Sequence, residues 1–206
     1  MIRFREPLTA DIRDFLNNNA LTDFSYSDLG CTRGRNVVGF NTDRFRIELG
    51  AGDAALEKAK RAIRDWRGFS TDWVRLCWPY KKIAPGAVVA VLVHHYGVYS
   101  LNAARIVYVV DEPKKFGFAF GSLLRHILRG EMLFLVYQEP DGKVYYELTS
   151  ISRPRHWLTW VFYPLGRQLQ NSFSRDSMRA LLESMLTHDS RRTAPAGPAA
   201  PPESAG

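Results

Sequence analysis

Residues 105–154 read RIVYVVDEPKKFGFAFGSLLRHILRGEMLFLVYQEPDGKVYYELTSISRP, and this stretch decides the fold. Within it, aromatic residues alternate with glycine or alanine, as in a strand with one bulky face and one nearly bare face. The bulky face would carry Phe116, Phe118 and Phe120. The bare face would carry Gly117, Ala119 and Gly121. We expect a helix or a bound ligand to approach the bare face closely.

The same stretch and the residues before it predict a run of antiparallel strands. Pro140-Asp141-Gly142 is a strong hairpin signal, and Asp111, Glu112 and Pro113 mark another turn. Parallel strands would need a crossover between each pair, and the segments between these strands are too short for one. The six predicted strands are 73–78, 87–96, 101–110, 115–120, 131–138 and 143–151.

Helical patterns flank this run of strands. A short helix is expected over 9–18, and a second begins at Asp53 after a half-exposed strand at 44–49. A long C-terminal helix is expected from Ser152, with a kink at Pro164. The predicted fold is therefore α+β, with a curved antiparallel sheet of about six to seven strands that grips the last helix. This element order resembles the helix-grip arrangement of START-like and birch-allergen-like domains, in which sheet and helix enclose an apolar cavity.

Composition favours a single folded domain over 1–189, followed by a disordered Pro- and Ala-rich tail over 190–206. The 206 residues carry a net charge of +7, but no nucleic-acid-binding motif accompanies it, so a nucleic-acid partner is not expected. Cys31 and Cys77 lack CxxC spacing, which favours a reducing compartment. Neither a secretory signal nor a membrane-spanning run is present in the sequence, so we expect a cytoplasmic protein.

Several separated motifs resemble an uncharacterised family of bacteria and plants, a domain of unknown function of the UPF0548 type. They are VVGFNTDRFRIELGAGDAALEKA at 37–59, the first part of the opening stretch at 105–131, SISRP at 150–154 and PLGRQLQNSF at 164–173. The resemblance extends to about residue 182 and implies no catalytic residues. This chain has Phe120 and Met132 where the family commonly has a tyrosine and an acidic residue, which weakens any role for a phenol or a carboxylate pair there.

The first functional hypothesis is a cavity between the sheet and the C-terminal helix that binds a hydrophobic or amphipathic small molecule. Apolar side chains would line it, and a few polar groups would orient the ligand. Arginine is suited to this second task because guanidinium binds carboxylate or phosphate through two hydrogen bonds. The predicted ligand contacts are Arg105, Phe116, Phe118, Phe120, His126 and Arg153.

The second hypothesis is an enzyme that uses the same cavity for cyclisation, dehydration or hydrolysis. His126 and Glu131 would act as base and acid, because a carboxylate near an imidazole can fix its orientation and charge. The simpler alternative is that these residues form a surface ion-pair cluster with the neighbouring Arg125 and Arg129.

The third hypothesis is peripheral attachment to an anionic membrane. Trp157 and Trp160, with Arg153 and Arg155, form an aromatic and basic patch of the kind found at membrane interfaces. Packing of these aromatic residues beneath the sheet is the alternative.

No metal or cofactor is expected from the sequence. His94 and His95 are adjacent on a predicted strand and would point to opposite faces, so they cannot easily share one metal ion. Residues 50–55 match the pattern GxGxxA, but a half-charged strand precedes them and no parallel strand follows. The carboxylates of Asp111 and Glu112 are expected to be solvated turn residues rather than an acid–base pair.

Overall fold

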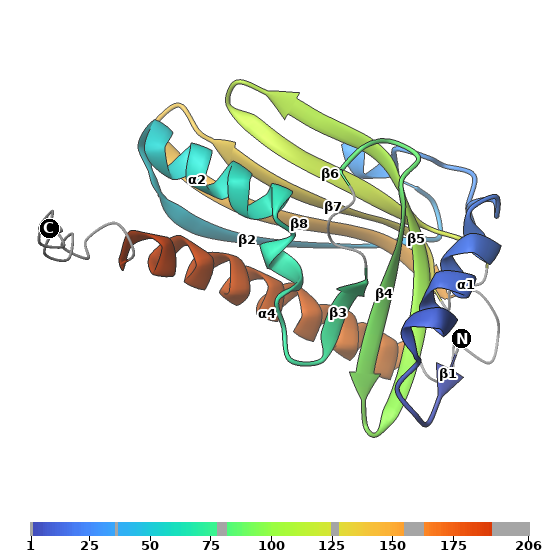
Figure 1. Cartoon of the computed structure of the whole chain (residues 1–206). Coiled ribbons are helices and arrows are strands. Elements are labelled where there is room, and N and C mark those ends of the chain that lie inside the picture. Colours follow the sequence, from blue (N-terminus) through green and yellow to red (C-terminus); the bar gives the residue numbers. More distant parts are fainter. Residues whose placement is uncertain (1, 36, 78–81, 125–127, 155–162, 191–206) are drawn as a thin grey trace, which may run out of the picture.

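The computed structural model describes residues 2–35, 37–77, 82–124, 128–154 and 163–190. Its centre is one antiparallel sheet with the strand order β2-β8-β7-β6-β5-β4-β3, and β1 pairs with β5 outside this path. The strands are β1 (Ile2–Arg3), β2 (Asn41–Ala51), β3 (Val74–Cys77), β4 (Val88–His95), β5 (Val98–Glu112), β6 (Lys115–Ser122), β7 (Leu128–Gln138) and β8 (Lys143–Pro154). The sheet is strongly bent, so that β4 and β5 run at a steep angle to β7 and β8 (Figure 1).

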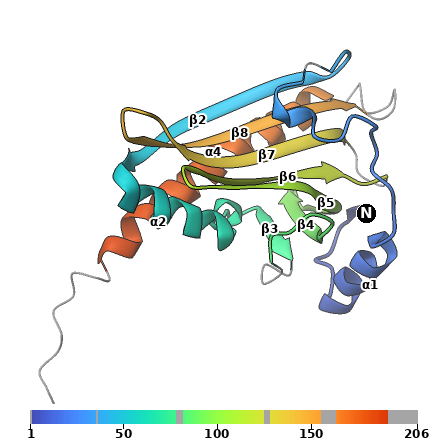
Figure 2. The same cartoon turned by 90° about the horizontal axis from the view of Figure 1, so that it is seen from above.

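The helices lie on both sides of this sheet. They are α1 (Thr9–Asn19), α2 (Gly52–Arg64) and α4 (Tyr163–Ser190), with short 3-10 turns η1 (Cys31–Arg33) and η2 (Arg67–Phe69). We call the face that packs against α2, η2 and α4 the inner face, and the face that carries α1 and η1 the outer face. Seen from above, α1 stands well apart from α2 and α4 (Figure 2).

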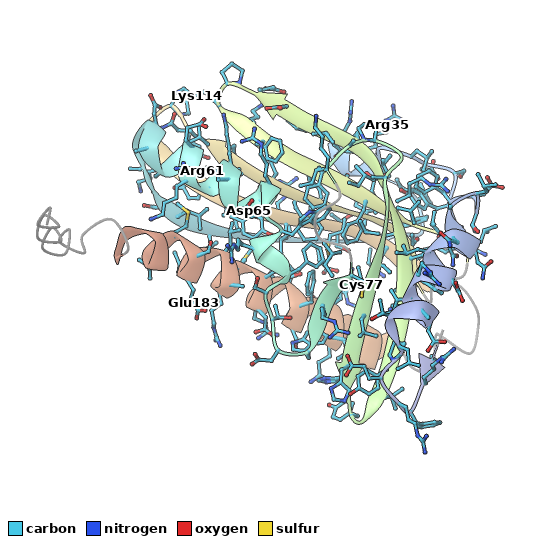
Figure 3. The ribbon with its side chains drawn as sticks, in the orientation of Figure 1. Arg35, Arg61, Asp65, Cys77, Lys114 and Glu183 are labelled. Atoms are coloured by element: carbon cyan, nitrogen blue, oxygen red, sulfur yellow. The ribbon has the colours of Figure 1, made fainter. Side chains whose placement is uncertain are left out.

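The main hydrophobic core fills the space between the inner face, α2 and α4. On α2, Leu56, Ala59 and Ile63 recur at helical spacing and are almost completely buried. Phe118 of β6 meets Trp66 edge to face, with ring centroids 4.9 Å apart. A second core on the outer face joins α1 to β4 and β5 and includes the buried Cys77 (Figure 3).

These elements confirm the predicted fold class of an antiparallel sheet with a long C-terminal helix. The six predicted strands and the strand at 44–49 are all present, and β1 was not predicted because two residues carry no periodic signal. β2 pairs antiparallel with β8, so the GxGxxA turn at 50–55 lacks the parallel strand that a dinucleotide site needs.

The predicted start of the last helix at Ser152 is wrong. Ser152 pairs with Gly130 in the sheet, and β8 continues to Pro154. The helix begins at Tyr163, so Pro164 lies in its first turn. Proline lacks an N–H that this turn would leave unbonded in any case, so it does not interrupt the helix there.

The prediction that a helix or ligand approaches the bare face of β6 is also wrong. That face is the outer face, where Ala119 packs with Tyr108 and Leu133. At Gly121 an added Cβ would collide with the Tyr26 hydroxyl and would lie 3.0 Å from carbon atoms of the Phe24 ring. The bare face therefore makes room for the segment that leads from α1 to η1.

Candidate functional site

A cavity of about 510 Å³ lies between the inner face of the sheet and α4. Strands β3 to β8 contribute residues to its wall, and α4 closes it through one side of its first three turns. The apolar lining includes Trp73, Val91, Val93, Ala104, Phe120, Met132, Leu169 and Phe173. The polar lining includes His95, Ser100, Asn102, Ser122, Arg129, Ser150, Ser152 and Gln170. A largely apolar wall with a few polar groups is typical of sites for small molecules.

Most of these polar groups are bonded to one another. The Gln170 amide reaches from α4 to β8, where it bonds to the Ser150 hydroxyl and lies 3.4 Å from Ser152 Oγ. Asn102 Nδ2 donates to Ser100 Oγ at 3.0 Å. The Ser122 hydroxyl accepts the Gly130 N–H at 2.9 Å. Such bonds offset the cost of removing polar groups from water and leave the wall well ordered.

The three phenylalanines predicted as ligand contacts do not share one environment. Phe120 lines the cavity. Phe116 and Phe118 are 3% and 1% exposed, and both belong to the core beneath α2. The guanidinium of Arg64 on α2 lies 4.1 Å from the centre of the Phe116 ring. These two rings stay outside the cavity because α2 covers their end of the inner face.

Arg105 lies on the outer face, contrary to its predicted position in the cavity. Its neighbour Ala104 lines the cavity, so the alternation of the strand turns Arg105 away. Arg105 Nη2 donates to the carbonyl oxygens of Ala20 at 2.9 Å and Thr22 at 2.8 Å. The guanidinium therefore holds the chain just after α1.

Arg153 is also turned to the outer face. Its guanidinium carbon lies 4.6 Å from the centre of the Phe40 ring, which packs with the buried Ile151. His126, Trp157, Trp160 and Arg155 lie outside the described residues. The structure thus brings only Phe120, of the described ligand contacts predicted from sequence, to the cavity wall.

The carboxylate of Glu131 points away from the cavity, into a polar cluster on the outer face. It accepts hydrogen bonds from the Tyr26 hydroxyl at 2.8 Å, from Gly30 N at 2.8 Å and from Thr32 N at 3.1 Å. The Thr32 hydroxyl is a fourth donor. Glu131 is 2% exposed, so four donors surround a carboxylate that hardly meets solvent. This placement does not agree with the acid–base role predicted for Glu131 in the cavity.

Burial and the nearby Glu131 charge raise the pKa of the Cys31 thiol from 9.0 to about 12. The same causes raise the pKa of Tyr26 above its usual value of 10.0. Both groups therefore keep their protons in the folded protein at pH values where the unfolded chain loses them.

We expect the free energy of unfolding to fall as the pH rises from about 9 towards 12. The unfolded chain releases the Cys31 proton above pH 9, so the stabilisation by the buried neutral thiol is complete below pH 9 and is lost above it. Urea unfolding of the protein and of Cys31→Ala at increasing pH measures this. The variant should show a shallower decline between pH 9 and 10, and an identical decline would contradict the assignment.

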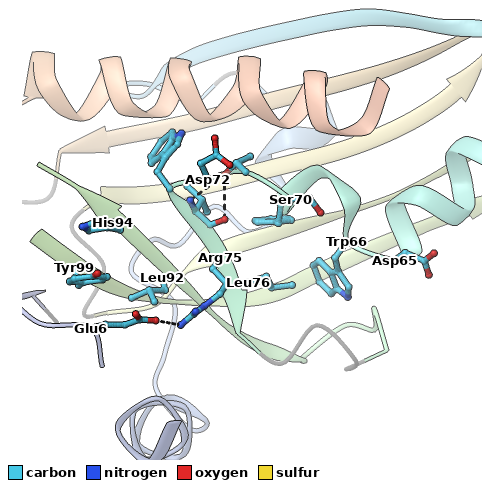
Figure 4. A pocket seen from close by; sticks show the side chains of 14 residues that line it. Glu6, Asp65, Trp66, Ser70, Asp72, Arg75, Leu76, Leu92, His94 and Tyr99 are labelled. Atoms are coloured by element: carbon cyan, nitrogen blue, oxygen red, sulfur yellow. Dashed lines mark hydrogen bonds and ion pairs between the residues drawn. The ribbon is translucent and has the colours of Figure 1, made fainter. Parts of the chain in front are cut away.

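A second pocket, of about 490 Å³, lies along the free edge of β3 (Figure 4). Arg75 Nη2 pairs with Glu6 Oε1 at 2.7 Å on one side of it. His94 stacks on Tyr99 with ring centroids 4.2 Å apart, whereas His95 lines the first cavity, so the two histidines do point to opposite faces. In the described part of the chain no group of three His, Cys, Asp or Glu side chains is placed to hold a metal ion.

Sequence reasoning missed the cavity residues on α4. Leu169, Gln170 and Phe173 follow a helical spacing, but only the tertiary contact with the sheet distinguishes a cavity wall from a core.

The sequence matches the family described as Domain of unknown function (DUF1990) over residues 25–180. The chain belongs to this family. A UPF0548 protein of Dictyostelium discoideum is 32% identical to it over 214 residues, covering 93% of this chain and 99% of the relative. A UPF0548 protein of Deinococcus radiodurans is 32% identical over 196 residues, covering 88% of this chain and 98% of the relative. The resemblance seen in the sequence motifs is thereby confirmed.

Among solved structures, a protein of Thermus thermophilus resembles this DUF1990 chain with a TM-score of 0.50 and 15% sequence identity. The match covers 72% of this chain and 99% of the other. At this identity the likeness concerns the fold alone. No helix within the described residues of the DUF1990 chain is both long enough and apolar enough to span a membrane.

Proposed function

We propose that this DUF1990 protein binds a hydrophobic or amphipathic small molecule in the cavity between the sheet and α4. The observation that carries the proposal is the cavity itself, whose volume of about 510 Å³ is within the range of ligand sites. Well-packed protein cores contain few voids larger than a water molecule, so a cavity of this size is unusual unless a ligand occupies it. The aromatic and aliphatic wall favours a ligand with a substantial apolar part.

The polar groups in the wall support the same proposal. A cavity that served only as a packing defect would be apolar and dry. Here Gln170 on α4 and Ser150 on β8 form a bonded polar strip across one side of the wall. Hydrogen bonds within the wall already offset the free energy of burying these groups, so they can orient a ligand at little further cost in free energy.

Filling the cavity from α4 tests the proposal. Gly166 lines the cavity, and a Cβ added to it would meet no atom within 4 Å. Gly166→Trp should fold, because replacing glycine within a helix gains about 0.5–1 kcal/mol of helix propensity. It should bind the uncharged dye aminoanthracene at least about tenfold more weakly than the wild type does, since an indole takes the ligand's place.

Gly166→Ala is the matched control, and it should bind the dye as the wild type does. Fluorescence titration gives the dissociation constants, and thermal unfolding checks that both variants are folded. Equal dye binding by wild type and Gly166→Trp, or no dye binding by the wild type, would contradict the proposal.

A further inference from the structure

Three polar residues of the cavity wall form a directed chain of hydrogen bonds between β8 and α4. Ser152 Oγ donates to Gln170 Oε1 at 3.4 Å, and Gln170 Nε2 donates to the Ser150 hydroxyl. The chain therefore ends at Ser150, whose oxygen accepts a bond from Gln170. A serine hydroxyl can accept and donate at the same time, so the Ser150 proton remains to be donated.

This proton is the unused donor of the chain. Among the residues whose positions the structure describes, the Ser150 hydroxyl accepts the bond from Gln170 but donates to no acceptor. Ser150 is 3% exposed, so bulk water hardly reaches it. A buried donor without an acceptor is unfavourable, and buried polar groups in folded proteins normally have partners. A ligand in the cavity that supplied an acceptor would satisfy this donor.

The sheet register places the Ser150 side chain on the inner face. Ser150 pairs with Met132 on β7, and Met132 pairs with Phe120 on β6. Cross-strand partners share a face of the sheet. Met132 belongs to the core between the sheet and α4, and Phe120 packs against that core. The bond between Ser150 and Gln170 of α4 agrees with this direction.

An apolar surface lies beside the donor. The row of Ser150, Met132 and Phe120 crosses three neighbouring strands, which makes it roughly 10 Å long. Leu169 and Phe173 line the same cavity from α4. A flat apolar molecule with one polar atom at its β8 end fits this arrangement.

We infer that the ligand of this cavity is a carbonyl compound with a largely apolar body, and that its carbonyl oxygen accepts a hydrogen bond from Ser150. The apolar body lies along Met132 and Phe120. A carbonyl oxygen suits the end of the chain because it accepts without donating. An alcohol would bring a proton that needs a further acceptor. The inference rests on the proposed function and adds the chemical class of the ligand.

Displacement of aminoanthracene by two matched tricyclic compounds tests this inference. Fluorenone and fluorene share the same fused rings, and only fluorenone carries a carbonyl oxygen. Wild-type protein should bind fluorenone at least about threefold more tightly than fluorene, because Ser150 replaces the water that the carbonyl loses. A cavity without a free donor should prefer fluorene, since burial of an unpaired carbonyl is unfavourable.

Ser150→Ala should shift the ratio of the two dissociation constants by about tenfold against fluorenone and leave fluorene binding within about twofold. Ser152→Ala is the matched control, because it removes the same group from the same strand, but the Ser152 proton is already donated to Gln170. This variant should keep the wild-type ratio. Thermal unfolding checks that both variants are folded.

The outcomes separate the inference from the proposed function. If the wild type binds the dye and fluorene but does not prefer fluorenone, the inference is wrong and the proposed function stands. The same conclusion follows if folded Ser150→Ala keeps the wild-type ratio, or if Ser152→Ala alone loses the preference. Failure of the dye and of both compounds to bind the wild type would overturn the proposed function together with the inference.

Discussion

Glu131→Ala is expected to lower the free energy of unfolding by about 3–5 kcal/mol, because it leaves several buried hydrogen-bond donors unsatisfied at about 1–3 kcal/mol each. The substitution leaves the Tyr26 hydroxyl, Gly30 N and both donors of Thr32 without their acceptor. Tyr26 and the segment around η1 would then lose the bonds that fix them to the outer face. Urea unfolding followed by tryptophan fluorescence measures the change.

Glu139→Ala is the control for this prediction. Glu139 forms an ion pair with Arg46 at 2.7 Å, but both side chains are more than a third exposed, so its removal should cost less than about 1 kcal/mol. Glu131→Gln should fall between the two, because the amide keeps one acceptor oxygen. A loss of less than about 1 kcal/mol in Glu131→Ala would contradict the role assigned to this carboxylate.

Gly130→Ala is expected to be more damaging still, with a loss of at least about 4 kcal/mol or no soluble protein. A Cβ at this position would collide with the carbonyl oxygen of Ile151 and would lie 2.8 Å from the Ser152 Cα. The φ of 144° adds strain for any residue with a side chain. Because β7 and β8 are both interior strands of the sheet, neither atom can move without breaking the ladder.

The matched control is Gly142→Ala in the hairpin between β7 and β8. Gly142 has a φ of 85°, but an added Cβ would meet no atom within 4 Å there. Only the backbone strain remains, at about 1–2 kcal/mol. Thermal unfolding of the two variants therefore separates the strain of the backbone from the collision. Similar losses in both would show that the close approach of β7 and β8 is not as described.

The fold was predictable because its main signals are local. The turn at Pro140-Asp141-Gly142 and the alternation along 115–120 define strands without reference to the rest of the chain. The start of α4 was not predictable from Ser152 and Pro154, because the same residues suit a helix start and the end of a strand. Pairing with β7 decides between them, and that is a tertiary contact.

The site was harder to predict than the fold because a strand places neighbouring residues on opposite faces. Sequence reasoning chose Arg105 and Glu131, whereas the cavity receives the side chains of their neighbours Ala104 and Met132. An error of one residue in the assignment of faces exchanges every inward and outward side chain. Phe120 was predicted correctly, but Phe116 and Phe118 lie in the core beneath α2 and not in the cavity.

The central claim is that the cavity between the sheet and α4 is a ligand site, and heteronuclear NMR during titration with dodecanoate tests it most directly. We predict saturable chemical-shift changes concentrated at cavity residues such as Val91, Phe120, Met132 and Leu169. Residues of the second pocket, such as His94 and Tyr99, should change little. No saturable change in the spectrum, or changes centred on the second pocket, would contradict the account.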